Sequence, residues 1–485
     1  MVVEILAGFL VAPYLVRTLG ATTYGLWIVI GSLSGYFSLV DLGLRGSVGR
    51  QLAFRRARQD WESANHIISS ALLIFCCLTV ITVIATAVAV VSLQRLFDIP
   101  AEQLANARLA MALVGVNLAL SFPLQVFDGS LWAAQRFDLL NYVDIPLTAA
   151  RAGLTFLLIR GADDIALLAM ISLFVTIAAG VMKGVLSFRL DRQLAVSIRN
   201  IRLDSVRQLF AFGWWSFILE LARLTKMQLT PILIGSLLGV AFVTPYSIAR
   251  RLQDYAHRVL WTATGVLVPV ATAFHAKAQP EQQQKLFIEG GKYSTAITLF
   301  LAGYLVCLGH SLIRLWMGPQ FVDAAVLLII LMIGEFLHMT QSVAGSIILA
   351  TARHRNLAWL WIVDTVLSVT LVALVAKRFG LIGVTTAYAV PQVLFAGVGI
   401  LVVGCRVTEI GIRRYLGAAI LPAIAMGALP VALLAGLTLF HTPTRWPVFL
   451  LYSAAYTLVY AGSCWSLLKP AFNRQMFGSV RLSGS

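Results

Sequence analysis

Long apolar runs separated by short polar breaks fill the 485-residue chain from one end to the other. A membrane-spanning helix needs about 20 predominantly apolar residues, so each run is long enough to cross a bilayer. We predict about fourteen spans. They lie at residues 1–16, 24–44, 65–94, 109–133, 141–159, 164–187, 208–235, 241–272, 293–313, 323–350, 357–376, 381–404, 415–439 and 447–468.

The apolar runs are continuous and lack the strict alternation that strands of a membrane barrel require. Inside a bilayer the backbone must satisfy its own hydrogen bonds, and an uninterrupted apolar run does this as a helix. We therefore predict an all-α, polytopic integral membrane protein.

Composition agrees with a membrane location. Hydrophobic residues make up 59% of the chain and charged residues only 12%, with a mean hydropathy of +0.86. This excludes an ordinary soluble domain. The five cysteines lie in or beside apolar runs without a CxxC pair, and no metal-ligand spacing is present. We therefore expect no disulfide framework, metal site or cofactor.

The net charge of +16 is distributed unevenly over the loops. The even-numbered loops and the tail hold about 23 Lys and Arg residues, and the odd-numbered loops hold about 8. Short cytoplasmic loops collect positive charge, so we predict that both termini are cytoplasmic. Because the basic residues are dispersed and form no single stripe, nucleic-acid binding is disfavoured.

A charged cluster interrupts the apolar runs between residues 220 and 258. Its members on the first helix recur every three residues and those on the next helix every four, so each set occupies roughly one helical face. Five cations face two anions, and an excess of buried positive charge favours an anionic ligand. Arginine suits an anionic ligand because its planar fork donates paired hydrogen bonds. The members are Glu220, Arg223, Lys226, Arg250, Arg251, Asp254 and Arg258.

The depth of this cluster depends on a turn. A single span at 227–249 would leave the charges as snorkelling rims at the bilayer surface. However, Leu238 and Gly239 match Leu19 and Gly20, which lie between the first two predicted spans. If this repeat holds, a turn at Leu238–Gly239 places the cluster within the membrane.

Further charged residues lie within or beside the spans. We expect Arg151 and Arg45 to contribute to a cationic, substrate-binding cavity, although Arg45 also fits a simple topology signal. Intramembrane carboxylates are the candidates for ion coupling, with Na⁺, H⁺ and the membrane potential all open. Each carboxylate also fits a structural partner for a nearby arginine. The candidates are Asp41, Asp144, Glu220, Asp254, Glu335 and Asp364.

The sequence resembles Wzx-type polysaccharide or O-antigen flippases of the MOP (multidrug/oligosaccharidyl-lipid/polysaccharide) exporter superfamily. The likeness is carried by APYLVRTLGATTYGLW at 12–27 and GYFSLVDLGL at 35–44, then by YSIA at 246–249 and FGLIGV at 379–384. These are packing and turn residues, spread over essentially the whole chain.

The resemblance implies two pseudo-symmetric six-helix lobes around a central cavity, plus two C-terminal helices. The lobes would be residues 1–190 and 208–404, joined by a basic cytoplasmic linker at 191–207. The additional helices would occupy 415–468 and a cytoplasmic tail 469–485.

The resemblance also implies a function in the bacterial inner membrane. Such proteins are alternating-access flippases for undecaprenyl-pyrophosphate-linked oligosaccharides, the repeat units of O-antigen, exopolysaccharide or capsule. The expected partners are the lipid-linked oligosaccharide, membrane lipids, and a polysaccharide polymerase with its chain-length regulator. The expected functional form is a monomer.

Two other classes fit less well. A multidrug antiporter of the same superfamily would carry cationic drugs, which a net positive cavity repels. A membrane glycosyltransferase or O-antigen polymerase would need catalytic residues on exported loops, and here those loops are short, without an Asp-x-Asp motif. We therefore expect a transporter and no catalytic residues.

Overall fold

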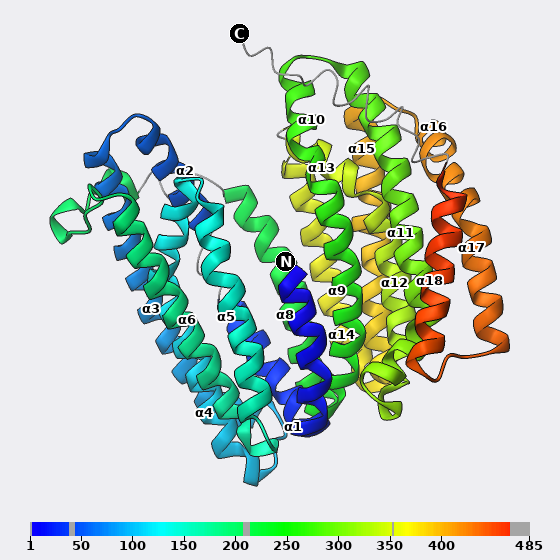
Figure 1. The fold of residues 1–485 in the computed structure, drawn as a ribbon, viewed down its shortest axis with the longest axis horizontal. Helices are drawn as coiled ribbons and strands as arrows, with labels where there is room; N and C mark the ends of the chain where they lie inside the picture. Colours follow the sequence, from blue (N-terminus) through cyan, green and yellow to red (C-terminus); the bar gives the residue numbers. More distant parts are fainter. Residues whose placement is uncertain (1, 38–43, 207–213, 352–353, 466–485) are drawn as a thin grey trace. The chain divides into compact units, whose positions relative to one another are not determined.

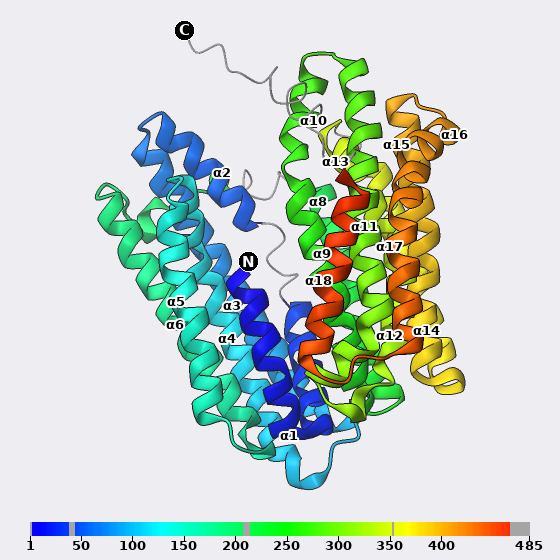
Figure 2. The same cartoon turned by 45° about the vertical axis from the view of Figure 1, so that its right-hand side comes forward.

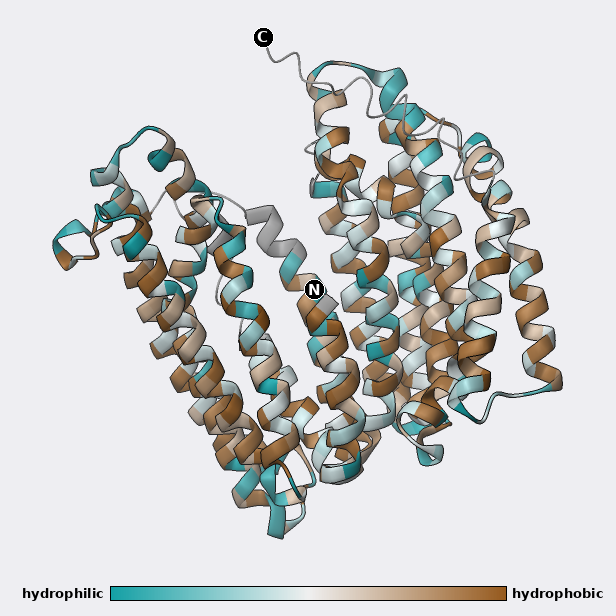
Figure 3. Cartoon of the chain, viewed as in Figure 1, coloured by the Kyte–Doolittle hydropathy of each residue, from teal (hydrophilic) through white to brown (hydrophobic). Residues whose placement is uncertain are grey.

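The fold was analysed in a computed structural model that describes residues 2–37, 44–206, 214–351 and 354–465. Within these ranges every regular element is a helix, and the predicted all-α membrane fold is confirmed (Figure 1). Figure 3 shows hydrophobic residues along many of the helices and hydrophilic residues at many of the turns. This distribution is typical of helices that cross a bilayer.

The chain packs as two compact units, which are described separately. The first consists of Met1–Ser247 with Val369–Val384, and the second of Ile248–Ser368 with Thr385–Ser485. These units are defined by packing alone and do not test the predicted domain boundaries. The six-helix lobes, the linker at 191–207 and the separate C-terminal helices therefore stay predictions.

The first unit contains α1(Val2–Phe37), α2(Leu44–Ala57), α3(Trp61–Leu96), α4(Ala101–Ala133), α5(Phe137–Leu158), α6(Ile165–Leu190) and α8(Trp214–Leu237). One apolar core of this unit joins α2, α3 and α4, and Phe75 stacks on Phe122 within it. At the start of α3, hydrogen bonds from Ser63 to the Asp60 carboxylate lower the pKa of Asp60 and cap the helix.

The second unit is built around α11(Pro280–Trp316), which contacts α12, α13, α17 and α18. Figures 1 and 2 both show α17 and α18 side by side along this helix. The other helices of this part of the chain are α9(Val243–Gly265), α10(Leu267–Ala276), α12(Ala324–Thr340), α13(Ser342–Ala350), α14(His354–Pro391), α15(Ile400–Thr408), α16(Ile412–Tyr415), α17(Leu421–Phe440) and α18(Trp446–Ser463). Short π-helical segments at Gln392–Gly399 and Leu416–Ile420 join α14 to α15 and α16 to α17.

Eight helical stretches among the described residues are long and apolar enough to cross a membrane, or nine when the bent pair α12 and α13 counts as one span. Two of these stretches, α1 and residues 355–408, each contain a glycine with non-helical backbone angles, and this glycine lies between two of the predicted spans. The more polar α5 and α8 and the shorter α18 coincide with three further predicted spans. The helices are therefore consistent with the prediction of about fourteen spans.

Glycines with positive φ make the chain reversals. Gly20 breaks α1 at φ 77° and Gly380 breaks α14 at φ 59°. Gly239, at φ 112°, follows the end of α8 at Leu237 and precedes the start of α9 at Val243. Residues other than glycine rarely adopt such backbone angles. The predicted turn at Leu238–Gly239 is confirmed, and the alternative single span at 227–249 is wrong.

The turn at Gly239 packs directly against α1. A Cβ atom on Gly25 would lie 2.0 Å from the Val240 carbonyl oxygen, so only glycine fits there without movement of the backbone. The Thr244 hydroxyl donates a hydrogen bond of 2.6 Å to the Ala21 carbonyl beside this contact. The two Leu-Gly turns that the sequence relates therefore meet within the first unit.

Replacing Gly25 with alanine should reduce stability by about 1–3 kcal/mol, because the new methyl group pushes the two backbones apart. The matched control is Gly31→Ala on the same helix, where a Cβ would meet nothing within 4 Å. Thermal unfolding midpoints of the purified variants in detergent measure the difference. Equal midpoints for the two variants would contradict the close approach.

Candidate functional site

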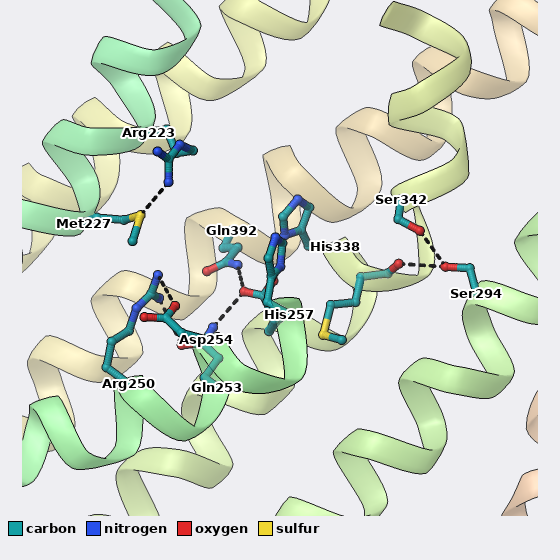
Figure 4. Close-up of polar contacts among 12 residues, drawn as sticks. Arg223, Met227, Arg250, Gln253, Asp254, His257, Ser294, His338, Ser342 and Gln392 are labelled. Carbon is teal, nitrogen blue, oxygen red and sulfur yellow. Dashed lines mark hydrogen bonds and ion pairs between the residues drawn. The ribbon is translucent and has the colours of Figure 1, made fainter. Parts of the chain in front are cut away.

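A buried carboxylate forms the centre of a polar network in the second unit. Glu335 on α12 is only 4% exposed. The Gln253 side-chain Nε2 on α9 donates a hydrogen bond of 2.7 Å to Glu335 Oε2, and Gln392 Nε2 donates to the same oxygen (Figure 4). Two amide donors thus stabilise one oxygen of the carboxylate. Burial of its negative charge within the membrane would be very costly without such partners.

Two histidines bind the other oxygen of this carboxylate. His257 Nδ1 lies 2.7 Å from Glu335 Oε1, and His338 Nδ1 lies 3.0 Å from the same atom. Because an ionised carboxylate only accepts hydrogen bonds, each imidazole donates from Nδ1. The two rings lie nearly parallel, with centroids 5.6 Å apart. Three titratable groups from α9 and α12 therefore meet at one oxygen.

Arg250 extends the network along α9. Its Nη2 lies 3.1 Å from Asp254 Oδ1, and its Nη1 donates to Gln253 Oε1 at 3.0 Å and to the Tyr388 hydroxyl at 2.6 Å. Since Gln253 accepts from Arg250, its amide nitrogen is directed toward Glu335. Within this unit Arg250 therefore positions the Gln253 amide, which donates a hydrogen bond to the buried carboxylate.

A second polar centre lies in the first unit, where Lys183 on α6 joins two carboxylates. The Lys183 ammonium lies 2.6 Å from Asp128 Oδ1 on α4 and 2.8 Å from Asp144 Oδ1 on α5. These groups line a pocket of about 200 Å³, together with polar side chains that can bind a hydroxyl group or a water. Those polar side chains are Ser121, Gln125, Thr148 and Thr176.

The first half of the predicted cationic cluster lies on α8. Arg223 Nε donates to Glu220 Oε2 at 2.9 Å, and Arg223 Nη2 donates to Glu220 Oε1. Both side chains are exposed, whereas Lys226 is buried. This set belongs to the first unit, and the α9 residues from Ile248 onward belong to the second, so the shared seam across both helices stays a prediction.

The other predicted residues are dispersed. Arg258 on α9 is exposed, and Arg251 is partly buried on the same helix. Arg151 is exposed on α5. Asp364 is fully buried on α14 and accepts a hydrogen bond of 3.5 Å from Ser368. Arg45 belongs to α2, and Asp41 lies outside the described residues.

Sequence reasoning missed the residues that complete both centres. His257 follows Arg250, Gln253 and Asp254 at helical spacing on α9, and His338 follows Glu335 by three residues. Histidines within predicted spans were the available signal, because ionisable groups in a membrane usually face a protein interior. Lys183 lies inside the predicted span at 164–187 and pairs with Asp128 and Asp144, and its position within an apolar run was the signal there.

Replacing Lys183 with methionine should cost about 2–3 kcal/mol of stability. Removing one partner of a fully buried ion pair costs about 3–5 kcal/mol, and the partial exposure of Asp144 reduces that value. The control is Arg136→Met, which removes the partner of Asp138 in a solvent-exposed ion pair and should change stability little. Unfolding midpoints in detergent test the contrast, and adding Asp144→Asn to Lys183→Met should recover part of the loss. Equal losses in the two single variants would show that Lys183 is not a buried structural partner.

The sequence is similar to a protein-family model and to two known membrane proteins. A sequence-family model described as "Polysaccharide biosynthesis protein" matches residues 1–275. An uncharacterized membrane protein, EpsK, from Bacillus subtilis (strain 168) is 22% identical over 409 residues, which is 79% of this chain and 76% of that protein. A putative O-antigen transporter from Shigella flexneri is 17% identical over 392 residues, covering 79% and 90%.

Solved structures show the same fold. An inward-facing multidrug resistance MATE family transporter of the MOP superfamily aligns with a TM-score of 0.71 at 16% identity, over 84% of this chain and 95% of that one. The lipid II flippase MurJ, in an inward closed conformation, aligns with a TM-score of 0.68 at 13% identity, over 98% and 97%. The family match covers more than half of the sequence, so the chain belongs to the polysaccharide biosynthesis protein family, and its resemblance to Wzx-type members of the MOP superfamily is confirmed.

Proposed function

We propose that this protein is an alternating-access flippase that moves an undecaprenyl-pyrophosphate-linked oligosaccharide across the bacterial inner membrane. The observation that carries the proposal is the net positive charge of the cluster from Glu220 to Arg258 on two transmembrane helices. A relative named as a putative O-antigen transporter and a structural neighbour named as a lipid II flippase support a lipid-linked saccharide as the cargo.

We infer the charges available to an anionic head group from the ion pairs on α8 and α9. Glu220 is bound by Arg223, and Asp254 is bound by Arg250, so each carboxylate of the cluster faces an arginine of its own helix. Arg258 lies one turn beyond Asp254 and is exposed. We therefore assign Arg258 as the principal contact for the pyrophosphate.

Guanidinium chemistry suits this role. The Arg258 guanidinium offers paired donors to phosphate oxygens. A cationic drug, the cargo of a multidrug transporter, would be repelled by the same positive charge. For this reason we favour a lipid-linked saccharide over a drug as the substrate, although the fold is shared with a multidrug transporter.

The same proposal includes orientation and partners. Both termini are cytoplasmic, the functional form is a monomer, and the product passes to a polysaccharide polymerase with its chain-length regulator. The carboxylates at Asp144, Asp254 and Glu335 are the candidates for ion coupling, since each belongs to a polar centre whose charge a bound cation would change.

Replacing Arg258 with glutamine should lower surface polysaccharide about tenfold or more, because a charge-assisted hydrogen bond is worth roughly 1.5–3 kcal/mol. The protein level in the membrane should not change, since Arg258 is exposed. Arg258→Lys should retain part of the activity. The charge-matched control is Lys277→Gln at the end of α10, which should behave as wild type. Full polysaccharide production in Arg258→Gln would remove this residue from the mechanism.

Topology reporters test the proposed orientation. A fusion that ends after Gly239 should report the periplasm, and one that ends after Lys277 should report the cytoplasm, because α9 and α10 lie between these two points. Alkaline phosphatase and green fluorescent protein fusions give opposite signals on the two sides. Reversed signals would place both termini in the periplasm.

A further inference from the structure

We propose that His257, Glu335 and His338 form a binding site for one divalent transition-metal ion, for which Zn²⁺ is the natural probe. The proposal does not depend on the transported substrate. Sequence analysis expected no metal site, because His257 and Glu335 are 78 positions apart and share no motif. The fold brings the ligands together from α9 and α12.

The ligand atoms already converge. One ligand atom from each residue lies within 4.8 Å of the other two, and the two Nδ1 atoms lie 2.7 Å and 3.0 Å from Glu335 Oε1. Zn²⁺ binds nitrogen and oxygen at about 2.0–2.2 Å, which places tetrahedral ligand atoms roughly 3.3–3.5 Å apart. To bind the ion, Oε1 moves about half an ångström away from each nitrogen, and the ligand atoms that lie up to 4.8 Å apart approach one another.

The chemistry of the ligands selects the class of ion. Two imidazoles and one carboxylate are the three-ligand set of an open zinc site, in which the fourth position takes water or another oxygen. Imidazole suits Zn²⁺, Cu²⁺ and Ni²⁺, whereas Mg²⁺ and Ca²⁺ prefer oxygen ligands alone. We therefore expect Zn²⁺ to bind and Mg²⁺ to compete poorly.

An outer set of hydrogen bonds orients the carboxylate for this task. Gln253 and Gln392 both donate to Glu335 Oε2, which leaves Oε1 directed at the two histidines. Arg250 in turn holds the Gln253 amide, as Figure 4 shows for the α9 side of the network. Outer hydrogen bonds of this kind fix ligand orientation in metal sites and typically change affinity 10–100-fold when they are removed.

Charge and access also favour a cation. Arg250 offsets the charge of Asp254, and the Glu335 carboxylate supplies the negative charge that attracts a cation to the two imidazoles. The His257 side chain is 38% exposed, while that of Glu335 is only 5% exposed. An ion can therefore enter past His257 and reach a carboxylate that is otherwise enclosed.

The test uses the purified full chain in detergent, without a polyhistidine tag and stripped of metal with a chelator. Competition with a chromophoric zinc chelator should show one Zn²⁺ per chain, with affinity reduced at least tenfold in His257→Ala and in His338→Ala. The matched control is His310→Ala, which removes an exposed histidine on α11 and should bind as wild type. Gln392→Leu should weaken binding by a smaller factor.

Two measurements on the wild-type protein keep the proposal testable if a variant fails to fold. Zn²⁺ should raise the thermal midpoint in a concentration-dependent way, and excess Mg²⁺ should not prevent the shift. Co²⁺ should give the visible absorption of a tetrahedral site with nitrogen and oxygen ligands. The absence of stoichiometric Zn²⁺ binding would overturn the proposal and leave a proton-binding network.

Equal binding in His257→Ala and wild type would also overturn it, by showing that the ion occupies adventitious surface groups.

These readouts measure binding alone, so they are separate from the transport test of Arg258. Loss of surface polysaccharide in Arg258→Gln with intact Zn²⁺ binding would support both proposals. Intact polysaccharide in Arg258→Gln with intact Zn²⁺ binding would contradict only the assigned cargo contact.

Discussion

The absence of water from the bilayer core is the constraint on which the rest of this structure depends. The backbone satisfies its own hydrogen bonds by forming helices, and each charge placed between helices must find a partner. Lys183 therefore joins two carboxylates in one unit, and Glu335 receives donors from four side chains in the other. In both cases polar groups on separate helices become mutually dependent, which fixes how those helices pack.

The same constraint limits where the chain can turn. A reversal leaves backbone groups without helical partners, so it is kept short and placed at the ends of spans. Gly20, Gly239 and Gly380 achieve this with positive φ angles that other residues avoid. Gly25 then allows one turn to pack against another at backbone contact distance. Glycine therefore determines both the direction of the chain and the closeness of its helices.

These constraints explain what sequence could predict. Helical spans follow from apolar length, and the turn at Leu238–Gly239 follows from its likeness to Leu19–Gly20. Glu335 could be identified as a candidate because a carboxylate inside a membrane span is energetically costly and usually serves a function. Its partners could not be identified from the sequence, since Gln253, His257 and Gln392 are distant from Glu335 along the chain. The apolar pattern of their helices does not show which helix packs against which. The predicted seam joining α8 and α9 could not be derived with certainty from spacing either. Residue spacing identifies one face of a helix, but it does not identify the helix that packs against that face.

The two polar centres differ in sign from the proposed cargo contact, and this difference has a physical consequence. Asp128 and Asp144 outnumber Lys183 in the first unit, and in the second Arg250 offsets Asp254 while Glu335 supplies a negative charge surrounded by four side chains. Such carboxylates attract a cation and repel an anion, whereas the proposed contact at Arg258 has the opposite preference. A cation bound at either centre can bias the protein's conformational equilibrium only by the difference in its affinity for the two states.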